Sequence, residues 1–386
     1  MSGLTVDFLA SYRDIPEPLW EACFAPPAEG RWWYAALEDS GLEDQFTFLY
    51  ALIRQDGQPV GIAPAFVMDV PLELVVPPEI LPLFAIPGRF FPKIMFQRTL
   101  FLGSPCSDEG RLGLLPGTER RAVLLAVHQA ALRQARRMKA PMIVWKDFVD
   151  SDTAADFAWL RQHCRLFAMP SFPGTEAAVA GDYYASLKAS RRYNLKKKLK
   201  RSHAAAELTV EVVQHPGPAA MDAIFALFWQ TYEKATTRFE LLNRAFFDRL
   251  AAVPSSHFIL LREAESGTLV AFMLCFDMDG QVINKFIGID YARPKDWFLY
   301  FRLWEEAVIW AQQRGARTIQ SGQTGYTPKI EMGHALIPMS NHGRHANRLI
   351  HWIYAKVAAT ISWATLDEDL AVYLKAHPEE GTATEP

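Results

Sequence analysis

The chain has 386 residues, 50% of them hydrophobic and 22% charged, which suits two or three globular domains and excludes a largely disordered protein. Its 40 basic and 43 acidic residues give a formal net charge of −3, which argues against a protein dominated by nucleic-acid binding but allows local basic patches. The four cysteines are scattered, without a CxxC pair or metal-ligand spacing, which is typical of free thiols in a reducing compartment.

The beginning of the chain lacks a basic region followed by a long apolar stretch, so we expect no secretory signal peptide. No uninterrupted apolar run approaches the ~18 residues that a membrane helix needs. The apolar stretch 70–88 contains five prolines and predicts an extended, partly exposed wall reaching to residue 92. That wall hints at an apolar ligand, although the prolines alone could explain it. These features favour a cytoplasmic protein with no membrane span.

The first half of the chain is predicted to mix helices and strands. A hairpin over 46–68 turns at Asp56-Gly57, because two apolar runs flank a pair of turn residues. The helix 118–138 is amphipathic, with an inner face of Val123, Leu124, Val127, Ala130, Ala131 and Leu132. The other elements expected in this half are helices at 16–24, 31–39 and 153–163, a strand ending near Leu102 and a buried strand at 141–148.

The second half repeats this order of elements, although no sequence identity between the halves is visible. It is predicted to contain helices at 218–235 and 242–252, a hairpin at 257–280, a strand at 282–289, a helix at 297–313 and a strand at 317–320. Two similar α/β domains, 1–178 and 179–375, are therefore expected, followed by a disordered polar tail at 376–386.

The stretch 281–343 carries the clearest candidate for a ligand site. A buried strand is followed by the polar loop 290–296 and then by a long helix. The first amides of a helix lack partners within it and the helix dipole adds positive charge, so this corner suits a phosphate group. Arg293 and Lys295 would reinforce it, whereas Pro294 removes one donor. An ordinary βαβ unit with a solvated loop is the alternative.

A basic helix is predicted at 183–203, between the two halves. It contains eight cationic side chains and no acid: Lys188, Arg191, Arg192, Lys196, Lys197, Lys198, Lys200 and Arg201. Like charges one turn apart repel, so the pattern favours a polyanionic partner such as a nucleotide phosphate, a carrier protein or an RNA acceptor stem. A solvated linker helix that aids solubility, or a membrane-surface helix, remains an alternative.

Several motifs occur in an order that resembles a known family. They are FFPKI (90–94), GSP (103–105), the basic helix, the segment 228–250 with its Phe-Phe pair, and a run resembling K-x-x-x-G-x-x-P-x-x-x-S-x-H formed by Lys329, Gly333, Pro338, Ser340 and His342. Together they resemble the FemAB-like, double-domain branch of the GNAT acyl-CoA N-acyltransferases. The likeness covers roughly residues 30–355.

The resemblance implies an α/β protein with tandem GNAT-like domains, each built on a mixed, strongly bent sheet. It also implies transfer of an acyl or aminoacyl group to an amine in a cleft between the domains, with acyl-CoA, acyl carrier protein or aminoacyl-tRNA as donor. We expect an acyl-CoA or carrier-protein thioester as co-substrate and no permanently bound cofactor. The sequence departs from the family because R/Q-x-x-G-x-G/A is absent, with 290–296 in its place, and because no coiled-coil insertion is present, which weakens the aminoacyl-tRNA option.

Acyl transfer to an amine needs a base, donors for the oxyanion and an acid for the leaving group. His342 is the first candidate base because its ordinary pKa suits the task, and Asp290 is the second. Tyr326 is the candidate acid. The alternatives are a core or capping histidine, a helix-capping aspartate and a packing tyrosine. We expect no covalent enzyme intermediate, since no G-x-S-x-G motif is present.

Binding candidates complete the predicted site. For the donor they are Gly288, whose missing side chain would let the strand open, and Phe298 at the helix start, together with Arg293 and Lys295. For the substrate they are Lys329, which would bind an acidic group, and Gln323, Lys93 and Ser104. We expect Lys329→Ala and His342→Ala to lower turnover without unfolding the protein.

The histidines His334, His342, His345 and His351 crowd one region, but their spacing matches no metal motif, so no metal is predicted. Two rival functions remain open. One is an aminoacyl-tRNA-dependent transferase, and the other is a binding protein that has lost catalysis and holds a polyanion through the basic helix.

Overall fold

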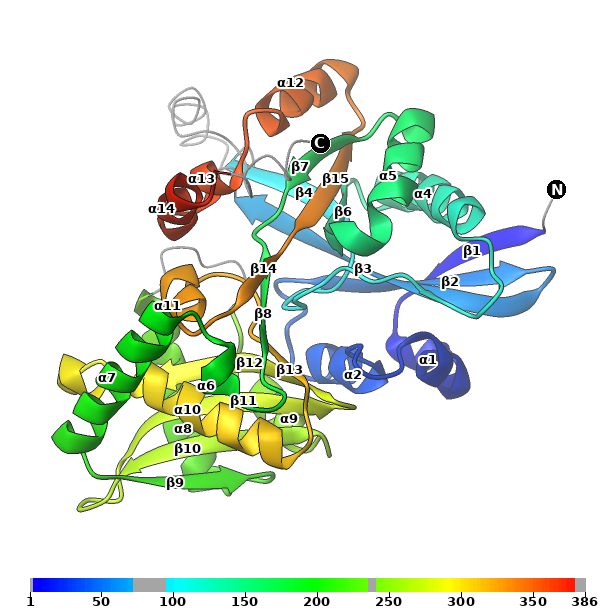
Figure 1. Ribbon diagram of the computed structural model, residues 1–386. Helices are drawn as coiled ribbons and strands as arrows, with labels where there is room; N and C mark the ends of the chain where they lie inside the picture. Colours follow the sequence, from blue (N-terminus) through cyan, green and yellow to red (C-terminus); the bar gives the residue numbers. More distant parts are fainter. Residues whose placement is uncertain (1–2, 72–94, 235–240, 379–386) are drawn as a thin grey trace. The chain divides into compact units, whose positions relative to one another are not determined.

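The computed structural model describes residues 3–71, 95–234 and 241–378. The chain divides into two compact units (Figure 1). Unit 1 comprises Met1–Ala25, Glu29–Pro173 and Pro338–Pro386, and unit 2 comprises Pro26–Ala28 and Gly174–Ile337. Most of the predicted wall at 70–92 lies outside the described residues.

Unit 1 is built on an eight-stranded mixed sheet with the order β1-β2-β3-β4-β6-β15-β7, and β5 pairs with β3. The strands are β1 (Leu4–Leu9), β2 (Thr47–Gln55), β3 (Gln58–Pro71), β4 (Phe96–Leu102), β5 (Gly113–Leu114), β6 (Met142–Val149), β7 (Phe167–Pro170) and β15 (Met339–His345). The helices are η1 (Tyr12–Asp14), α1 (Glu17–Cys23), α2 (Arg31–Glu38), α4 (Arg120–Arg137), α5 (Asp150–Cys164), α12 (Arg348–Ala358), α13 (Trp363–Leu366) and α14 (Glu368–Ala376).

Unit 2 is built on a seven-stranded mixed sheet with the order β14-β8-β13-β12-β11-β10-β9. Its strands are β8 (Gly174–Ala178), β9 (Leu208–Val213), β10 (Ser256–Glu263), β11 (Leu269–Met278), β12 (Gln281–Ile289), β13 (Thr318–Gln320) and β14 (Ala335–Ile337). Its helices are α6 (Tyr183–Ser186), α7 (Ala189–Ala205), α8 (Pro218–Lys234), α9 (Arg244–Ala251), η4 (Lys295–Trp297), α10 (Leu299–Gln313) and α11 (Tyr326–Glu331).

The two sheets have the same topology. In each, five strands follow in chain order and the fourth and fifth are parallel: β4 with β6 in unit 1, and β12 with β13 in unit 2. In unit 1, β15 lies between β6 and β7, whereas in unit 2, β8 lies between β13 and β14. β8, the last strand in the first half of the sequence, therefore joins the sheet of unit 2. β15, the last strand in the second half, joins the sheet of unit 1. The prediction of two like-built α/β halves is confirmed.

This exchange of strands changes the domain boundaries. The sequence analysis places residues 179–375 in one domain, but the chain from Pro338 onward belongs to unit 1. The physical reason is backbone pairing, because β15 is hydrogen-bonded to β6 on one side and to β7 on the other. Side-chain patterns along a strand do not reveal which sheet that strand joins.

The cores follow the predicted hydrophobic patterns. On α4 the expected inner face is buried at Val123, Leu124 and Val127, which pack over the sheet of unit 1. On α10, Leu303 and Trp304 are buried in the core of unit 2, and the Trp304 Nε1–H donates to the Tyr183 hydroxyl at 2.7 Å. Burial of these apolar faces is the main term that stabilises both units.

The predicted basic helix 183–203 is in fact two helices. Leu187 and Lys188 are extended, with φ/ψ of −75°/143° and −53°/141°, and they separate α6 from α7. The break lets Tyr183 and Leu187 both enter the core of unit 2. Within the described residues, no helix is long and apolar enough to cross a bilayer.

Candidate functional site

In unit 2 the parallel strands β12 and β13 pair over a short distance and then separate. β13 ends at Gln320, so only Gln281–Ile283 of β12 pair with it. Along its other edge, β12 pairs with β11, and this pairing contains a bulge. Leu274 lies opposite Phe286 and Cys275 lies opposite Asn284, so Lys285 is the extra residue. Bulges bend a strand and change its hydrogen-bonding direction. The far half of β12 therefore presents a backbone edge that β13 does not cover.

Gly288 does not mark this opening, contrary to the sequence interpretation. The bulge lies at Lys285. A Cβ added at Gly288 would lie 2.4 Å from the ring of Phe272 and 2.6 Å from the backbone carbon of Leu227. Glycine is required there because α8 approaches the strand closely.

The beginning of α10 differs from its counterpart in unit 1. α10 connects β12 to β13, and α4 lies at the same position between β4 and β6. On α4 the carboxylate of Glu119 caps the helix and accepts from the amides of Arg121 and Ala122 at 3.1 and 2.5 Å. On α10 the N-cap residue Phe298 is left-handed, with φ 44° and ψ 44°, and no side chain caps the helix. Of these two equivalent helix ends, the one in unit 2 is the uncapped, positively polarised end.

The loop before α10 is held by ion pairs. Arg293 bonds to the Asp290 carboxylate at 3.0 Å and to the Glu263 carboxylate at 3.2 Å. The second carboxylate oxygen of Asp290 accepts from the Ala292 amide at 3.0 Å. Two carboxylates already neutralise the Arg293 guanidinium, and these ion pairs compete with its predicted role in phosphate binding. The Asp290 carboxylate is likewise held by Arg293 and by the Ala292 amide, and these contacts compete with its predicted role as a base. Lys295 is exposed.

Helix α7 brings further positive charge to this corner. The Ser202 hydroxyl donates to the Trp297 carbonyl, which anchors α7 against η4. The guanidinium of Arg201 then lies 5.4 Å from the Phe298 ring, and the Lys198 ammonium lies 4.3 Å from the Phe301 ring. Lys198 also pairs with Glu331. Arg201 is thus a cation beside the start of α10 that the sequence did not connect with it.

A buried polar network that the sequence analysis missed lies where β12 and β13 separate. His334 places Nδ1 2.8 Å from the Lys329 carbonyl and Nε2 2.9 Å from the Ser321 hydroxyl. A carbonyl only accepts, so Nδ1 carries the proton and Nε2 accepts from Ser321. The Asn284 amide lies 3.5 Å from the same hydroxyl. The network thereby links β12 to the residue that follows β13.

Burial, and then the charge of Lys329, lower the pKa of His334 to about 3, so the imidazole is neutral at pH 7. No motif in the sequence identifies the network. Ser321 and His334 are 13 residues apart in the chain, and the fold of the intervening turn and α11 brings them together.

Lys329 has surroundings unlike those expected. It is 6% exposed, and its ammonium donates to the carbonyls of Ser321, Gly322 and Gln323 at 2.5, 3.3 and 3.0 Å. An ammonium has three hydrogens, and three carbonyls face them here. The geometry favours holding the turn 321–323 over direct binding of an acidic group. Tyr326, the candidate acid, is fully buried at the start of α11.

Two further predicted residues, His342 and Ser104, lie in unit 1. His342 on β15 is 5% exposed and stacks on Phe157 of α5 at a ring-centroid distance of 4.2 Å. Burial, and secondarily Arg161, lower the pKa of His342 to about 3. These are the surroundings of a core histidine and do not favour its predicted role as the base. Ser104 is buried and accepts from the Trp33 indole at 3.1 Å, and Lys93 lies outside the described residues.

The histidines that invite a metal interpretation are divided between the units: His334 belongs to unit 2, and His342, His345 and His351 belong to unit 1. In the part of the chain that the structure describes, no three or more His, Cys, Asp or Glu side chains are placed to hold a metal ion.

Two units of one topology, each with a parallel pair at its fourth and fifth strands, define a tandem GNAT-type fold. The chain belongs to the FemAB-like family, described as peptidoglycan biosynthesis/recognition, whose model matches residues 11–358. The expected resemblance is confirmed. Among curated proteins, none matches the chain.

Solved structures share the fold at low sequence identity. FemX is 11% identical, with a TM-score of 0.59, over 90% of this chain and 100% of that chain. L-PGS from Bacillus licheniformis is 13% identical, with a TM-score of 0.53, over 86% and 97%. A tandem GNAT protein from the clavulanic acid biosynthesis pathway is 12% identical, with a TM-score of 0.51, over 89% and 99%. Family and fold together support a transferase of the tandem-GNAT type.

Proposed function

We propose that the protein transfers an acyl group from a thioester donor, acyl-CoA or acyl carrier protein, to an amine acceptor, and that unit 2 holds the donor. The observation that carries this proposal is the contrast between two equivalent helix ends. Glu119 fills the end of α4 with a carboxylate, whereas α10 begins at Phe298 with no side-chain cap and with Arg201 nearby. A phosphorylated donor is attracted by the second end and repelled by the first.

The uncovered edge of β12 provides a place for the rest of the donor. Beyond Ile283 the strand is not paired with β13, and it continues to Ile289 at the loop that leads to α10. An extended arm with amide groups can bond to such an edge as an added strand would. The phosphate end then lies at α10, and the acyl end lies toward Asn284 and the bulge.

The reaction requires no covalent enzyme intermediate. The neutral amine attacks the thioester carbonyl carbon, a C–N bond forms, the C–S bond breaks, and the thiolate takes up a proton. We propose that His334 acts as a positioning residue, because its burial makes it a weak base while its Nε2 fixes the Ser321 hydroxyl. Of the two predicted bases, Asp290 follows β12 in unit 2 and is proposed to take up the proton that the attacking nitrogen loses, whereas His342 is buried in the core of unit 1 and is not proposed for this step.

An aminoacyl-tRNA donor is the second candidate, and one observation favours it. On α7, the cations Arg191, Arg192, Lys196, Lys197, Lys198, Lys200 and Arg201 follow one another without an acid, and Lys196, Lys197, Lys200 and Arg201 are exposed. A row of exposed cations on one helix suits the phosphates of an RNA.

Donor binding to the purified full chain tests the proposal. Acetyl-CoA, a longer acyl-CoA, acyl carrier protein and tRNA are each titrated by calorimetry. Phe298→Asp places a carboxylate where Glu119 stands in unit 1, and aspartate tolerates the left-handed backbone. At about 5 Å from a phosphate, each pair of like charges costs roughly 1–3 kcal/mol. The affinity for acyl-CoA is therefore expected to fall at least about tenfold.

Glu119→Gln is the matched control, since it changes the equivalent helix end in unit 1 and should leave acyl-CoA binding unchanged. Equal acyl-CoA affinity in wild type and Phe298→Asp would remove the donor from α10. Binding of tRNA alone, steeply weakened by salt, would favour the second candidate. Donor binding without any transfer to amines would instead indicate a binding protein.

A further inference from the structure

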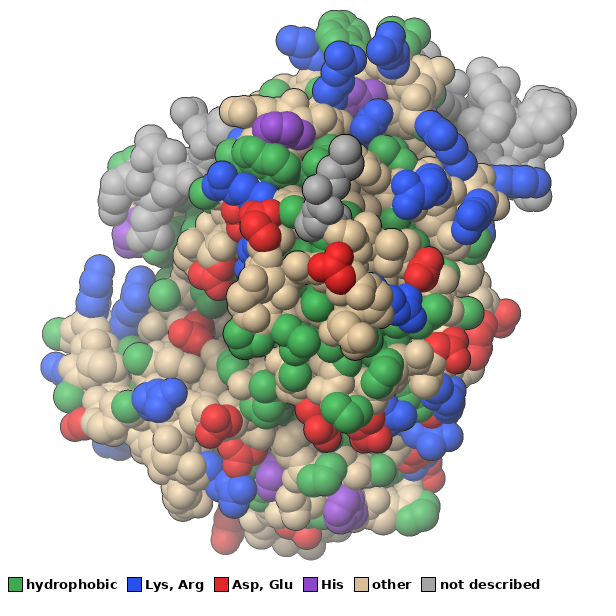
Figure 2. Space-filling view, turned by 90° about the vertical axis from the view of Figure 1, so that its right-hand side faces the viewer, with side chains coloured by type: hydrophobic (Ala, Val, Ile, Leu, Met, Phe, Trp, Pro, Cys, Tyr) green, Lys and Arg blue, Asp and Glu red, His purple; other side chains and the backbone are tan. Residues whose placement is uncertain are grey.

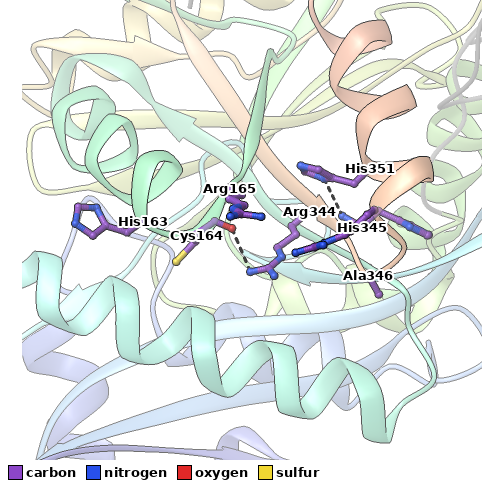
Figure 3. A pocket seen from close by; sticks show the side chains of 8 residues that line it. His163, Cys164, Arg165, Arg344, His345, Ala346 and His351 are labelled. Carbon is purple, nitrogen blue, oxygen red and sulfur yellow. Dashed lines mark hydrogen bonds between the residues drawn. The ribbon is translucent and has the colours of Figure 1, made fainter.

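Unit 1 contains an open cavity of about 600 Å³ that the transfer reaction does not use. It lies between the end of α5 and the corner that joins β15 to α12 (Figure 3). Three arginines and three histidines line it: Arg165, Arg344, Arg348, His163, His345 and His351. Within the described residues, none of the three arginines forms an ion pair with a carboxylate. The cavity is therefore positive and uncompensated.

The arginines are held in place but keep donors for a ligand. Arg165 has a left-handed backbone, with φ 54° and ψ 52°, as the C-cap of α5. The Arg344 guanidinium donates to the Cys164 carbonyl at 3.1 Å, and Figure 3 shows its side chain near Arg165 and His345. A guanidinium has five N–H groups, so this bond leaves most of the fork of Arg344 for an oxyanion. Planar, bidentate recognition of phosphate is typical of arginine.

Helix α12 forms one border of the cavity and exposes an apolar face. Leu349, Trp352 and Ile353 share one side of the helix and are 67%, 58% and 43% exposed. The opposite side packs on β7, where the rings of His351 and Tyr354 lie 5.6 and 6.2 Å from that of Phe167. Folding of unit 1 leaves this apolar patch unburied, and a patch of this kind marks an interaction surface.

The charges around α12 identify the partner. The helix carries Arg348 and Lys356 and no acidic residue. Figure 2 shows basic and hydrophobic side chains gathered at the end of unit 1 where α12 lies, with the acidic side chains of this face lying away from it. A short helix with an exposed Trp/Leu/Ile face, basic flanks and an arginine cavity beside it is complementary to an anionic lipid surface.

We propose that the cavity binds the phosphate headgroup of an anionic phospholipid while the exposed face of α12 enters the bilayer interface. The Arg344 and Arg348 guanidiniums bind the phosphate oxygens. Trp352 and Leu349 enter the boundary between headgroups and acyl chains, to a depth of roughly 5–10 Å. Unit 1 is then seated peripherally on a membrane. The inference does not depend on which donor unit 2 holds.

Vesicle co-sedimentation of the full chain tests this surface. Vesicles of phosphatidylcholine alone are compared with vesicles of phosphatidylcholine mixed with phosphatidylglycerol. Wild type is expected to sediment only with the second. Each cation near an anionic surface contributes about 1 kcal/mol, so the double variant Arg344→Gln/Arg348→Gln should weaken binding roughly 30-fold.

The matched control is Lys197→Gln/Lys200→Gln on α7, which removes the same charge from exposed positions of unit 2. It should leave sedimentation unchanged. An equal loss in the control would show attraction by net charge alone and would overturn the site. Absence of binding to anionic vesicles would overturn it as well. So would inorganic phosphate binding to the cavity, measured by calorimetry, without any binding to vesicles.

The apolar face is tested separately. Trp352→Ala changes an exposed side chain, so the fold should be kept, which thermal unfolding checks. Vesicle binding should fall at least about tenfold, because the variant removes a large interfacial side chain. Tyr193→Ala on α7, an exposed aromatic residue with 66% exposure, is the control and should bind as wild type does. If Trp352→Ala instead converts a dimer into a monomer in analytical ultracentrifugation and leaves vesicle binding intact, the face is a protein interface and the proposal is wrong.

Discussion

Replacing Lys329 by methionine removes a buried ammonium while keeping the length of the side chain. Three carbonyls then lose their donor: those of Ser321 and Gln323 at 2.5 and 3.0 Å, and that of Gly322 at the longer distance of 3.3 Å. A charge-assisted hydrogen bond contributes about 1.5–3 kcal/mol, and a buried carbonyl left without a partner costs about 1–3 kcal/mol.

These contributions do not add in full. Removing the lysine also removes the cost of keeping an ammonium out of water, and Gln323 is only half-buried, so water can reach part of the turn. We therefore expect a net loss of about 2–4 kcal/mol in the free energy of unfolding, out of a typical total of about 5–15 kcal/mol. This replaces the earlier expectation that Lys329→Ala would lower turnover without affecting the fold.

Urea unfolding followed by circular dichroism measures the loss, with Lys197→Met on the exposed side of α7 as a control that should change stability by less than about 0.5 kcal/mol. A second readout is the titration of His334 by NMR. The Lys329 charge contributes to lowering the pKa of His334, so the pKa should rise in Lys329→Met. A variant as stable as wild type, with His334 titrating unchanged, would refute the assignment of Lys329 to the turn.

Two further predictions concern packing and pH. Gly288→Ala should destabilise unit 2 by about 1–3 kcal/mol, because the new methyl group would meet the backbone of α8. Gly217→Ala, where a Cβ meets nothing within 4 Å, should cost little, and equal thermal unfolding of the two variants would contradict this reasoning. His342 has its pKa lowered to about 3, below the unfolded value of about 6.5, so it stays neutral in the fold while the unfolded chain takes up a proton. Stability from this residue is complete above pH 6.5 and is lost as the pH falls toward 3, by about 1.4 kcal/mol per pH unit. His342→Phe should therefore flatten the stability profile between pH 7 and pH 5 in urea unfolding, and a profile parallel to that of wild type would contradict a neutral core histidine.

The sequence predicted correctly those features that depend on neighbouring residues, such as a hairpin turn and the buried face of a helix. The turn Asp56-Gly57 has positive φ at both residues, 51° and 82°, as the hairpin between β2 and β3 requires. The apolar period of α4 placed its buried face correctly at Val123, Leu124 and Val127. The basic segment 183–203 was predicted as one helix because its charge pattern is uninterrupted. In the structure Tyr183 and Leu187 both enter the core, and the helix is broken at Lys188.

The candidate site was only partly predictable. The corner before α10 was located because a strand, a polar loop and a helix follow one another in the chain. The ion pair of Arg293 with Glu263 was not predicted, since Glu263 lies on β10, far from Arg293 in the sequence. Likewise, His334 was grouped with other histidines by proximity in sequence, whereas the fold places it against Ser321.

The sequence by itself determined the class of fold, the repeated order of elements and the family, because these depend on hydrophobic periods, turn residues and ordered motifs along the chain. Only the tertiary structure decided which sheet β8 and β15 complete, because strand pairing joins backbones without regard to side-chain pattern. It also decided that Glu119 caps one of two equivalent helix ends while the other begins at Phe298 without a side-chain cap. The proposal that unit 2 holds a phosphorylated donor rests on that difference, since a carboxylate on the amides of a helix excludes a second anion.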